Sequence, residues 1–324
     1  MATDTWNLVG DIGGTNARFG INRGPTGDHQ HIATYKVADY PDFSDVLRHL
    51  MEDIRRLGLA QGAPMAACFA VAGPPHLDTV SFTNSSWQFT RDTISQQTGV
   101  SLVHIINDFA AVARALPAIS DSELVQIGGG HRDDKGPIVA LGAGTGLGVG
   151  ALIQNQTGHP LVVTGEGGHV DFAPVTDVEV SVLQYLRSRY GRVSIERLCC
   201  GDGIVNLYQA LADLRGLTPQ LTSAADIGRA AQSETDPLAR ETMAMFFAVL
   251  GASAGNFALT FGALGGVYIA GGIVPRYLDL LRRSDFRARF LAKGRFADYL
   301  SAIPTYVITH EATGLLGAAL TLHD

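Results

Sequence analysis

Two glycine–threonine turns, each set between two apolar runs, constrain this chain more than any other feature. The first follows residues 6–9 and consists of Asp11, Ile12, Gly13, Gly14, Thr15 and Asn16. The second follows residues 138–141 and consists of Gly142, Ala143, Gly144, Thr145 and Gly146. A further apolar run leaves each turn, at 17–21 and 147–151, so both stretches predict a β-hairpin. Glycine lets backbone amides approach an anion and threonine adds a hydroxyl donor, so the pair predicts a triphosphate site; two ordinary glycine-rich turns are the alternative.

The rest of the chain alternates strand and helix signals. Strands are expected at 31–37, 65–71, 102–106, 266–270 and 305–308, and helices at 43–57, from 109 to Pro117, at 178–190, 203–215, 237–261 and 311–322. Residues 117–136 are expected to form a loop with a hinge. Because the second half repeats the plan of the first, a length of 324 residues predicts two related α/β lobes facing a cleft.

Composition excludes several classes of protein. The net charge is −7 with no basic run, which argues against a nucleic-acid partner. Three cysteines, Cys68, Cys199 and Cys200, have neither disulfide nor metal spacing and suit a reduced compartment. Residues 1–4 contain no basic segment ahead of an apolar one, so we expect no signal peptide.

One charge-free stretch needs a separate interpretation. No Asp, Glu, Lys or Arg occurs from residue 242 to residue 275, which is long enough to suggest a membrane span. Polar residues and repeated glycines interrupt it, so we interpret it as a buried helix at 237–261 followed by a buried strand, and expect no membrane partner.

Several polar residues stand where a ligand could be held. Asn107 and Asp108 follow an apolar strand, where a carboxylate can accept a proton from a substrate hydroxyl; alternatively, Asp108 is the N-cap of the next helix. Glu166 and His169 lie in a glycine-rich segment that suits a tight loop presenting both side chains. A surface turn with solvated charges is the alternative. Glu196 begins a helix or turn, where it would complement the helix dipole. Such groups recognise vicinal hydroxyls, so together with the phosphate loops they indicate a sugar kinase.

In order and spacing, these motifs resemble the bacterial glucokinases of the proteobacterial type, in the hexokinase–actin–Hsp70 ATPase superfamily. The resemblance runs from Leu8 to about Leu316, and it includes Gly271, Gly272 and the residues that follow them. It implies a two-lobed α/β ATPase fold of ribonuclease H-like lobes with an interlobe cleft. Residues 1–118 with 309–324 would form the smaller lobe, the C-terminal helix packing back on it, and 119–308 the larger.

The resemblance also implies the activity, which is ATP-dependent phosphorylation of glucose at the 6-hydroxyl. Asp108 resembles the general base, and Asn107, Glu166, His169 and Glu196 resemble sugar ligands. The nucleotide-side positions are Asp11, Gly13, Gly14, Thr15, Asn16, Gly144, Thr145, Gly146, Gly271 and Gly272, with Asp11 facing Mg²⁺ through water. A cytoplasmic homodimer acting in glycolysis, using ATP and Mg²⁺ without structural zinc, is the family expectation.

Two segments depart from the family pattern. Ser85 stands where the family would have histidine, and Cys199-Cys200 replaces part of a Ser/Gly-rich turn. These departures concern the shape of the sugar pocket. The alternatives are a kinase for another hexose or an amino sugar, and a non-catalytic sugar-sensing regulator on the same scaffold.

Overall fold

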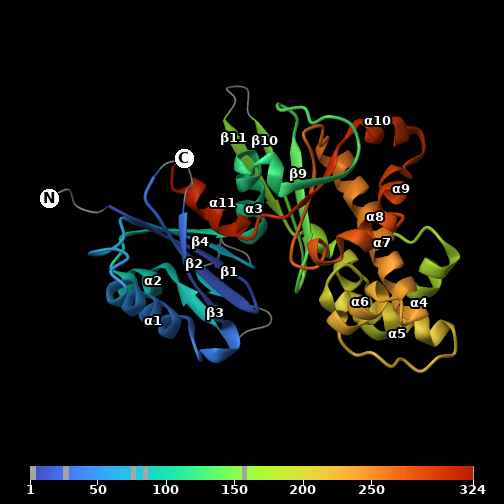
Figure 1. Ribbon diagram of the computed structural model, residues 1–324, viewed down its shortest axis with the longest axis horizontal. Helices are drawn as coiled ribbons and strands as arrows, with labels where there is room; N and C mark the ends of the chain where they lie inside the picture. The colour runs from blue at the N-terminus through green and yellow to red at the C-terminus, as the bar shows by residue number, and fades with distance from the viewer. Residues whose placement is uncertain (1–4, 25–28, 74–77, 83–86, 155–158, 324) are drawn as a thin grey trace. The chain divides into compact units, whose positions relative to one another are not determined.

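The computed structural model describes residues 5–24, 29–73, 78–82, 87–154 and 159–323. The chain divides into two compact units (Figure 1). The first comprises Met1–Ile119 together with His310–Asp324, and the second comprises Ser120–Thr309. Each unit has its own sheet and its own core.

The first unit is built on a five-stranded sheet in the order β3-β2-β1-β4-β7. Its strands are β1 (Asn7–Ile12), β2 (Asn16–Asn22), β3 (His29–Lys36), β4 (Ala66–Val71) and β7 (Leu102–Asn107). The first predicted hairpin is confirmed, because β1 pairs antiparallel with β2. On its other side β1 runs parallel to β4, and β4 runs parallel to β7. Two short strands, β5 (Thr79–Ser81) and β6 (Gln88–Thr90), pair separately.

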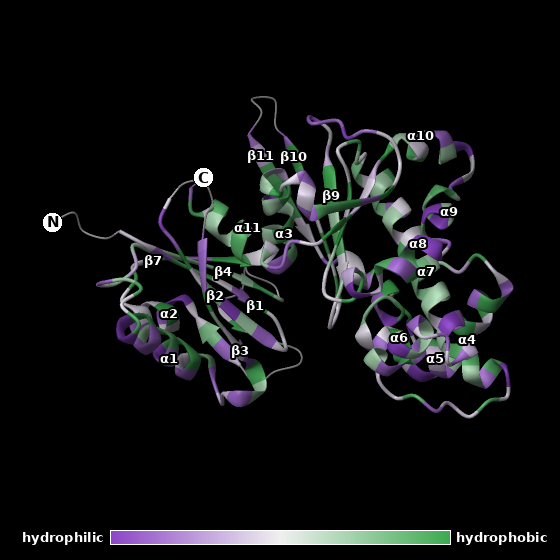
Figure 2. Ribbon diagram, viewed as in Figure 1, coloured by the Kyte–Doolittle hydropathy of each residue, from purple (hydrophilic) through white to green (hydrophobic). Residues whose placement is uncertain are grey.

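Helices cover both faces of this sheet. They are α1 (Phe43–Arg56), α2 (Arg91–Thr98), α3 (Asp108–Ala115) and α11 (Thr313–Thr321), with 3-10 turns η1 (Val37–Asp39) and η2 (Leu116–Ala118). Successive residues of a strand face opposite sides, so Leu8 joins the core under α1 whereas Val9 packs against α11. Burial on both faces explains why the central strand β4 is apolar and buried throughout, whereas the edge strand β3 carries polar, exposed residues. Helix α1 has one buried and one exposed face, so polar and apolar residues are interspersed along its ribbon in Figure 2.

The C-terminal helix α11 is part of the first unit. In Figure 1 this red helix lies against α3, among elements from the N-terminal half of the chain. The contact is very close, since a Cβ atom on Gly317 would overlap the carbonyl oxygen of Ala111. Leu315, Ala318 and Ala319 complete the packing against Val9 and Cys68.

The second unit is built on a six-stranded sheet in the order β11-β10-β9-β12-β13-β8. Its strands are β8 (Leu124–Gly128), β9 (Ile138–Ala143), β10 (Leu147–Gln154), β11 (Pro160–Gly165), β12 (Gly266–Ala270) and β13 (Thr305–Ile308). The second predicted hairpin is confirmed by the antiparallel pairing of β9 and β10. Strand β12 runs parallel to both β9 and β13.

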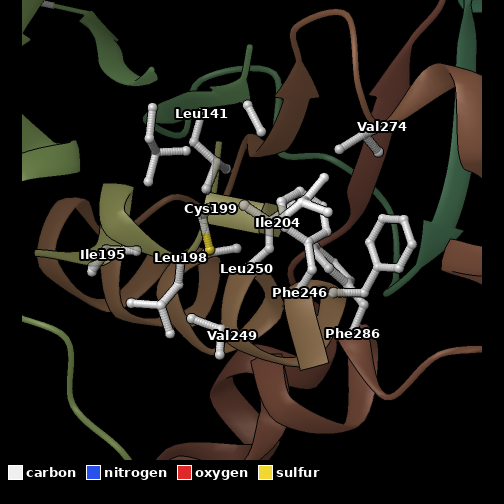
Figure 3. Packing of buried hydrophobic residues seen from close by; sticks show 14 of the residues in the cluster. Leu141, Ile195, Leu198, Cys199, Ile204, Phe246, Val249, Leu250, Val274 and Phe286 are labelled. Atoms are coloured by element: carbon white, nitrogen blue, oxygen red, sulfur yellow. The ribbon is translucent and has the colours of Figure 1, made fainter. Parts of the chain in front are cut away.

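The helices of the second unit pack around one long apolar helix, α7. They are α4 (Asp177–Tyr190), α5 (Gly201–Leu214), α6 (Ala224–Gln232), α7 (Pro237–Phe261), α8 (Leu278–Arg283), α9 (Phe286–Leu291) and α10 (Ala297–Ala302), with 3-10 turns η3 (Asp121–Glu123), η4 (Gly167–His169), η5 (Ile195–Arg197), η6 (Pro275–Tyr277) and η7 (Gly294–Phe296). Figure 3 shows Phe246, Val249 and Leu250 of α7 at the centre of this core, beside Leu198 and Ile204.

Helix α7 begins and ends as its sequence signals indicate. The Asp236 carboxylate caps it by accepting hydrogen bonds from the amides of Leu238 (2.8 Å) and Ala239 (3.2 Å), and Pro237 occupies the first turn. Gly262, with φ +62°, ends it in the left-handed conformation. By length and composition α7 could cross a membrane, and it is the one helix in the described ranges that could. Since α5, α6 and α9 pack on it, it is the predicted core helix.

A buried ion pair ties α4 to α9. The Glu179 carboxylate faces both terminal nitrogens of Arg289, at 2.6 and 3.1 Å, and also accepts from the amide of Val175 at 2.7 Å. Burial alone would raise the pKa of Glu179, but Arg289 and the amide donors outweigh it and hold that pKa below its usual value. The charge is thereby compensated within the core.

The expectation that residues 117–136 form a loop is wrong in part. Leu124–Gly128 is the edge strand β8, which pairs antiparallel with β13. Its partner lies more than 170 residues away, so no local pattern marked it. The strands β5, β6 and β11 and the helices α2, α6, α8, α9 and α10 were also not predicted. Helices α8, α9 and α10 have only six residues each, too few to show a helical period.

We predict that Gly317→Ala destabilises the first unit by about 1–3 kcal/mol, because the added methyl group must push α11 away from α3. Both tryptophans, Trp6 and Trp87, are buried in this unit, so their fluorescence during urea unfolding reports on it selectively. Gly24→Ala is the control, since nothing lies within 4 Å of its added atom. Equal midpoints for the two variants would contradict the close packing.

Candidate active site

The first hairpin turn lies at the end of β1. The amide of Gly13 donates to the carbonyl of Asn16 at 2.9 Å, which closes the turn, and the amide of Val37 donates to the Thr15 carbonyl at 3.0 Å. Within the described residues the amides of Gly14 and Thr15 donate to no other group. Free amides in a glycine turn suit an anion such as phosphate.

Asp11 lies near the end of β1, on the same face as Val9. It stands opposite Arg18 in β2, whose Nη1 is 3.4 Å from the Asp11 Oδ2. Burial raises the pKa of Asp11, and Arg18 partly offsets that rise. Gly314 of α11 packs against the same carboxyl group, since a Cβ atom there would lie 2.7 Å from the Asp11 Cγ. Sequence reasoning missed this role for Gly314; its place in the first turn of a helix of small residues was the available signal.

Asn107 and Asp108 lie where β7 meets α3. The Asn107 side chain caps the helix, accepting from the amides of Phe109 (2.9 Å) and Ala110 (3.1 Å). The alternative that Asp108 is the N-cap is therefore wrong. Asp108 is the first residue of the helix, and its Oδ1 also accepts from the Phe109 amide at 2.9 Å. Because Asn107 supplies the cap, a carboxylate at position 108 is not needed to start α3.

These residues share one edge of the first unit's sheet. Asp11 pairs in register with Ala70 of β4, and Ala70 pairs with Ile106 of β7. Asp11 and the turn that follows it therefore lie at the same end of the parallel strands as Asn107 and Asp108. The carboxyl ends of parallel strands are where α/β proteins place their ligands.

The second hairpin turn, between β9 and β10, is held by contacts from two other segments. The amide of Gly144 donates to the Gly146 carbonyl at 2.9 Å, while the Gly144 carbonyl accepts from the amide of Gly201, also at 2.9 Å. From the neighbouring strand β12, Gly271 follows with φ +87°. A Cβ atom on Gly271 would lie 2.9 Å from the Ala143 carbonyl carbon. Only glycine allows that approach, so the Gly271-Gly272 turn abuts the phosphate-type loop.

Glu166 and His169 lie at the end of β11 and in η4, and both are exposed. The glycines between them are required by packing. A Cβ atom on Gly167 would lie 2.8 Å from the Val149 Cβ, and one on Gly168 would overlap the Leu147 carbonyl oxygen. The backbone therefore rests directly on β10, and the two polar side chains are left at the surface.

Glu196 lies in η5, next to the glycine-rich segment. An antiparallel bridge between Asp171 and Ser194 joins the two segments, with the amide of Ile195 donating to the Val170 carbonyl at 2.9 Å. The Glu196 Oε2 accepts from the amide of Leu147 at 2.9 Å. The expectation that Glu196 only complements a helix dipole is thus incomplete, because its carboxylate contacts the end of the second phosphate-type loop.

The structure thus brings together, within the second unit, all the second-half residues that the sequence singled out. Around the ends of β9, β10 and β12 lie the loop Gly144, Thr145 and Gly146, the polar residues Glu166, His169 and Glu196, and the turn Gly271 and Gly272. No group of three or more Cys, His, Asp or Glu side chains suited to a metal ion occurs among the residues the structure describes. Residues 83–86, which include Ser85, lie outside them.

The cysteines are buried structural residues. The Cys200 Sγ caps α5 by accepting from the Gly203 amide at 3.3 Å. Figure 3 shows the Cys199 sulfur among Leu198, Ile204 and Leu250. Burial raises the pKa of Cys68 to about 12 and that of Cys200 to about 11, and it raises the pKa of Cys199 as well.

Known proteins resemble the chain along its whole length. A family model described as Glucokinase matches residues 8–324. A glucokinase from Hahella chejuensis (strain KCTC 2396) is 42% identical over 324 residues, covering 100% of this chain and 99% of that protein. The crystal structure of a glucokinase from an Antarctic psychrotroph is 35% identical, with a TM-score of 0.84 and coverage of 98% of both chains.

A more distant solved structure shares the fold. The glucokinase from Balamuthia mandrillaris, solved in complex with glucose, is 22% identical with a TM-score of 0.82, covering 98% of this chain and 93% of that one. The predicted α/β fold of the hexokinase–actin type is confirmed by these likenesses.

We predict that the native protein resists thiol reagents. A raised pKa means that at pH 8 almost none of each buried thiol is present as the reactive thiolate. With Ellman's reagent, the folded protein should release less than one equivalent over several minutes, and the protein in guanidinium chloride should release three, one per cysteine. Rapid release of a full equivalent from the native protein would show an accessible cysteine.

Proposed function

Because the chain belongs to the glucokinase family, we propose that it transfers the γ-phosphoryl group of ATP to the 6-hydroxyl of glucose, giving glucose 6-phosphate and ADP. The observation that carries this proposal lies within the second unit. There the carboxylate of Glu196, a residue expected to bind sugar, accepts a hydrogen bond from Leu147. Leu147 begins the strand that follows the second glycine–threonine loop, which is expected to bind phosphate. A site that joins polyol recognition to phosphate binding suits phosphoryl transfer to a sugar.

Asp108 is proposed as the general base. It would accept the proton of the 6-hydroxyl while that oxygen attacks the γ-phosphorus and the bond to the β–γ bridging oxygen breaks, releasing ADP. The capping role of Asn107 supports this assignment, because it leaves the Asp108 carboxylate unnecessary as an N-cap. Burial of the adjoining α3 residues keeps the base on a rigid element.

The remaining sugar hydroxyls are proposed to bind Asn107, Glu166, His169 and Glu196. The Asn107 Oδ1 is engaged in the helix cap, so its Nδ2 is the atom that would donate to glucose. Carboxylates accept from hydroxyls and the imidazole can donate or accept, which matches a polyol. Asn107 and Asp108 belong to the first unit and the other three to the second, so we propose that residues 1–118 with 309–324 and residues 119–308 act as the two lobes.

ATP is proposed to bind through both glycine–threonine loops and the Gly271-Gly272 turn. The Gly14 and Thr15 amides would contact the phosphates, and Gly144, Thr145 and Gly146 would do so from the second unit. Mg²⁺ fits the Asp11 side chain by donor type, since the ion prefers carboxylate oxygen, and its charge would favour the ionised form of a group whose pKa burial raises. When bound, the ion supplies charge neutralisation of the phosphates.

The two alternatives are separable by assay. Coupled ADP release over a panel of hexoses and amino sugars, with ATP and polyphosphate compared as donors, distinguishes a glucokinase from a kinase of wider or different specificity. A sugar-sensing regulator would bind glucose without releasing ADP. We further propose a cytoplasmic homodimer acting at the entry of glucose into glycolysis, on the basis of the family; sedimentation analysis tests the dimer.

We predict that Asp108→Asn lowers kcat by about 10²–10⁴-fold while glucose still binds, because the amide cannot accept the hydroxyl proton. Asp92→Asn is the matched control, since Asp92 is likewise an acidic residue in the first turn of a helix of the first unit. Turnover by the coupled assay and glucose binding by calorimetry are the measurements. If the Asp108 variant kept more than about a tenth of the wild-type kcat, a general-base role would be excluded.

We also predict that Gly314→Ala lowers kcat by about 10²-fold, because the new methyl group would lie 2.7 Å from the Asp11 Cγ and displace that carboxyl group. The Mg²⁺ concentration for half-maximal activity should rise. Gly317→Ala is the comparison, since it perturbs the same helix against Ala111 rather than against Asp11. If the two variants had a similar kcat under conditions in which both are folded, the loss of activity would come from altered helix packing and not from displacement of Asp11.

A further inference from the structure

Leu147, the first residue of β10, is held on both sides by the segments proposed to bind sugar. Its amide donates to the Glu196 Oε2 at 2.9 Å, across 49 residues of sequence. Its carbonyl lies beneath Gly168, where a Cβ atom would overlap the oxygen. Leu147 directly follows Gly146 of the second phosphate-type loop, so both segments contact the residue that ends that loop.

Glu196 also limits the conformation of the loop itself. A Cβ atom on Gly146 would lie 2.6 Å from the Glu196 Oε2, so the carboxylate packs directly on that residue. Five residues after Glu196, the Gly201 amide donates to the Gly144 carbonyl at 2.9 Å. The segment from Glu196 to Gly201 thus contacts the loop at two points, one on each side of Thr145.

One carboxylate can serve both substrates. Its two oxygens offer about four lone-pair positions. The Oε2 is engaged by Leu147, and within the described residues no hydrogen bond to the Oε1 is found, so that oxygen can accept from a sugar hydroxyl. A hydrogen bond to a charged acceptor is also stronger and better defined than one between neutral groups, which suits a positioning role.

We propose that Glu196 is the positioning residue of the second phosphate loop and that, through it, sugar and nucleotide binding are coupled. The proposal rests on the function proposed above but extends it. Through Leu147 and Gly146, Glu196 fixes the conformation of the loop even when no sugar is bound. Glucose then restrains the same carboxylate, so each substrate strengthens the binding of the other, as linkage requires.

Nucleotide binding in the absence of sugar tests the proposal directly. ADP binding is measured by isothermal titration calorimetry without glucose for the wild type, Glu196→Ala, Glu196→Gln and Asp177→Ala. We expect Glu196→Ala to weaken ADP binding by about 5- to 150-fold, the usual range of a coupling between sites. Glu196→Gln keeps an acceptor oxygen for the Leu147 amide and should weaken it less. Asp177→Ala is the comparison, because Asp177 is an exposed acidic residue in the first turn of α4, within the same unit but outside the proposed site, so its ADP affinity should equal that of the wild type.

Two results would overturn the proposal. One is wild-type ADP affinity in Glu196→Ala; the other is equal weakening of ADP binding in Glu196→Ala and Asp177→Ala. Should Glu196→Ala fail to fold, as judged by its thermal melt, Glu196→Gln decides the matter: its ADP affinity must fall below that of Asp177→Ala. The KM for ATP at saturating glucose should follow the same order. A wild type that binds ADP but shows no sugar phosphorylation would refute the proposed function instead, so the two failures are distinguishable.

Discussion

Close backbone approach at glycine is the constraint on which the functional parts of both units depend. Gly168 rests on the carbonyl of Leu147, Gly271 on that of Ala143, and Gly317 on that of Ala111. At each position a methyl group would meet backbone atoms, which cannot move aside as a flexible side chain can. The glycines therefore act less as flexible joints than as contact points that set how near one segment lies to another.

The same constraint explains why polar residues gather at the ends of strands. The central strands of the two sheets, β1, β4, β9 and β12, are buried along most of their length and offer no place for a ligand there. Ligand-binding groups can enter only where a strand ends and a turn or helix begins. Asn107, Asp108 and the two glycine–threonine turns all occupy such positions.

Within the second unit, the beginning of β10 contacts the segments proposed to bind the two substrates. A single residue, Leu147, contacts Glu196 through its amide and Gly168 through its carbonyl. Both segments carry residues proposed to bind sugar, and the residues just before Leu147 form the loop proposed to bind phosphate. Coupling between substrates then needs no long pathway through the unit, because the groups concerned are one hydrogen bond apart. The apolar core around α7 packs against β9 and β12, the strands next to this region.

Local signals in the sequence determined much of this fold. The bounds of α7, β12 and β13 are those predicted, since a cap at Asp236, a helix-ending glycine at Gly262 and continuous apolar runs act over a few residues. The two hairpins were predictable for the same reason. Tertiary structure alone decided the features that depend on distant partners. Strand β8 exists because β13 lies beside it, Asn107 rather than Asp108 caps α3, and Glu196 finds the amide of Leu147. Periodicity and capping describe a residue's neighbours along the chain, whereas these contacts join residues that only the folded topology brings together.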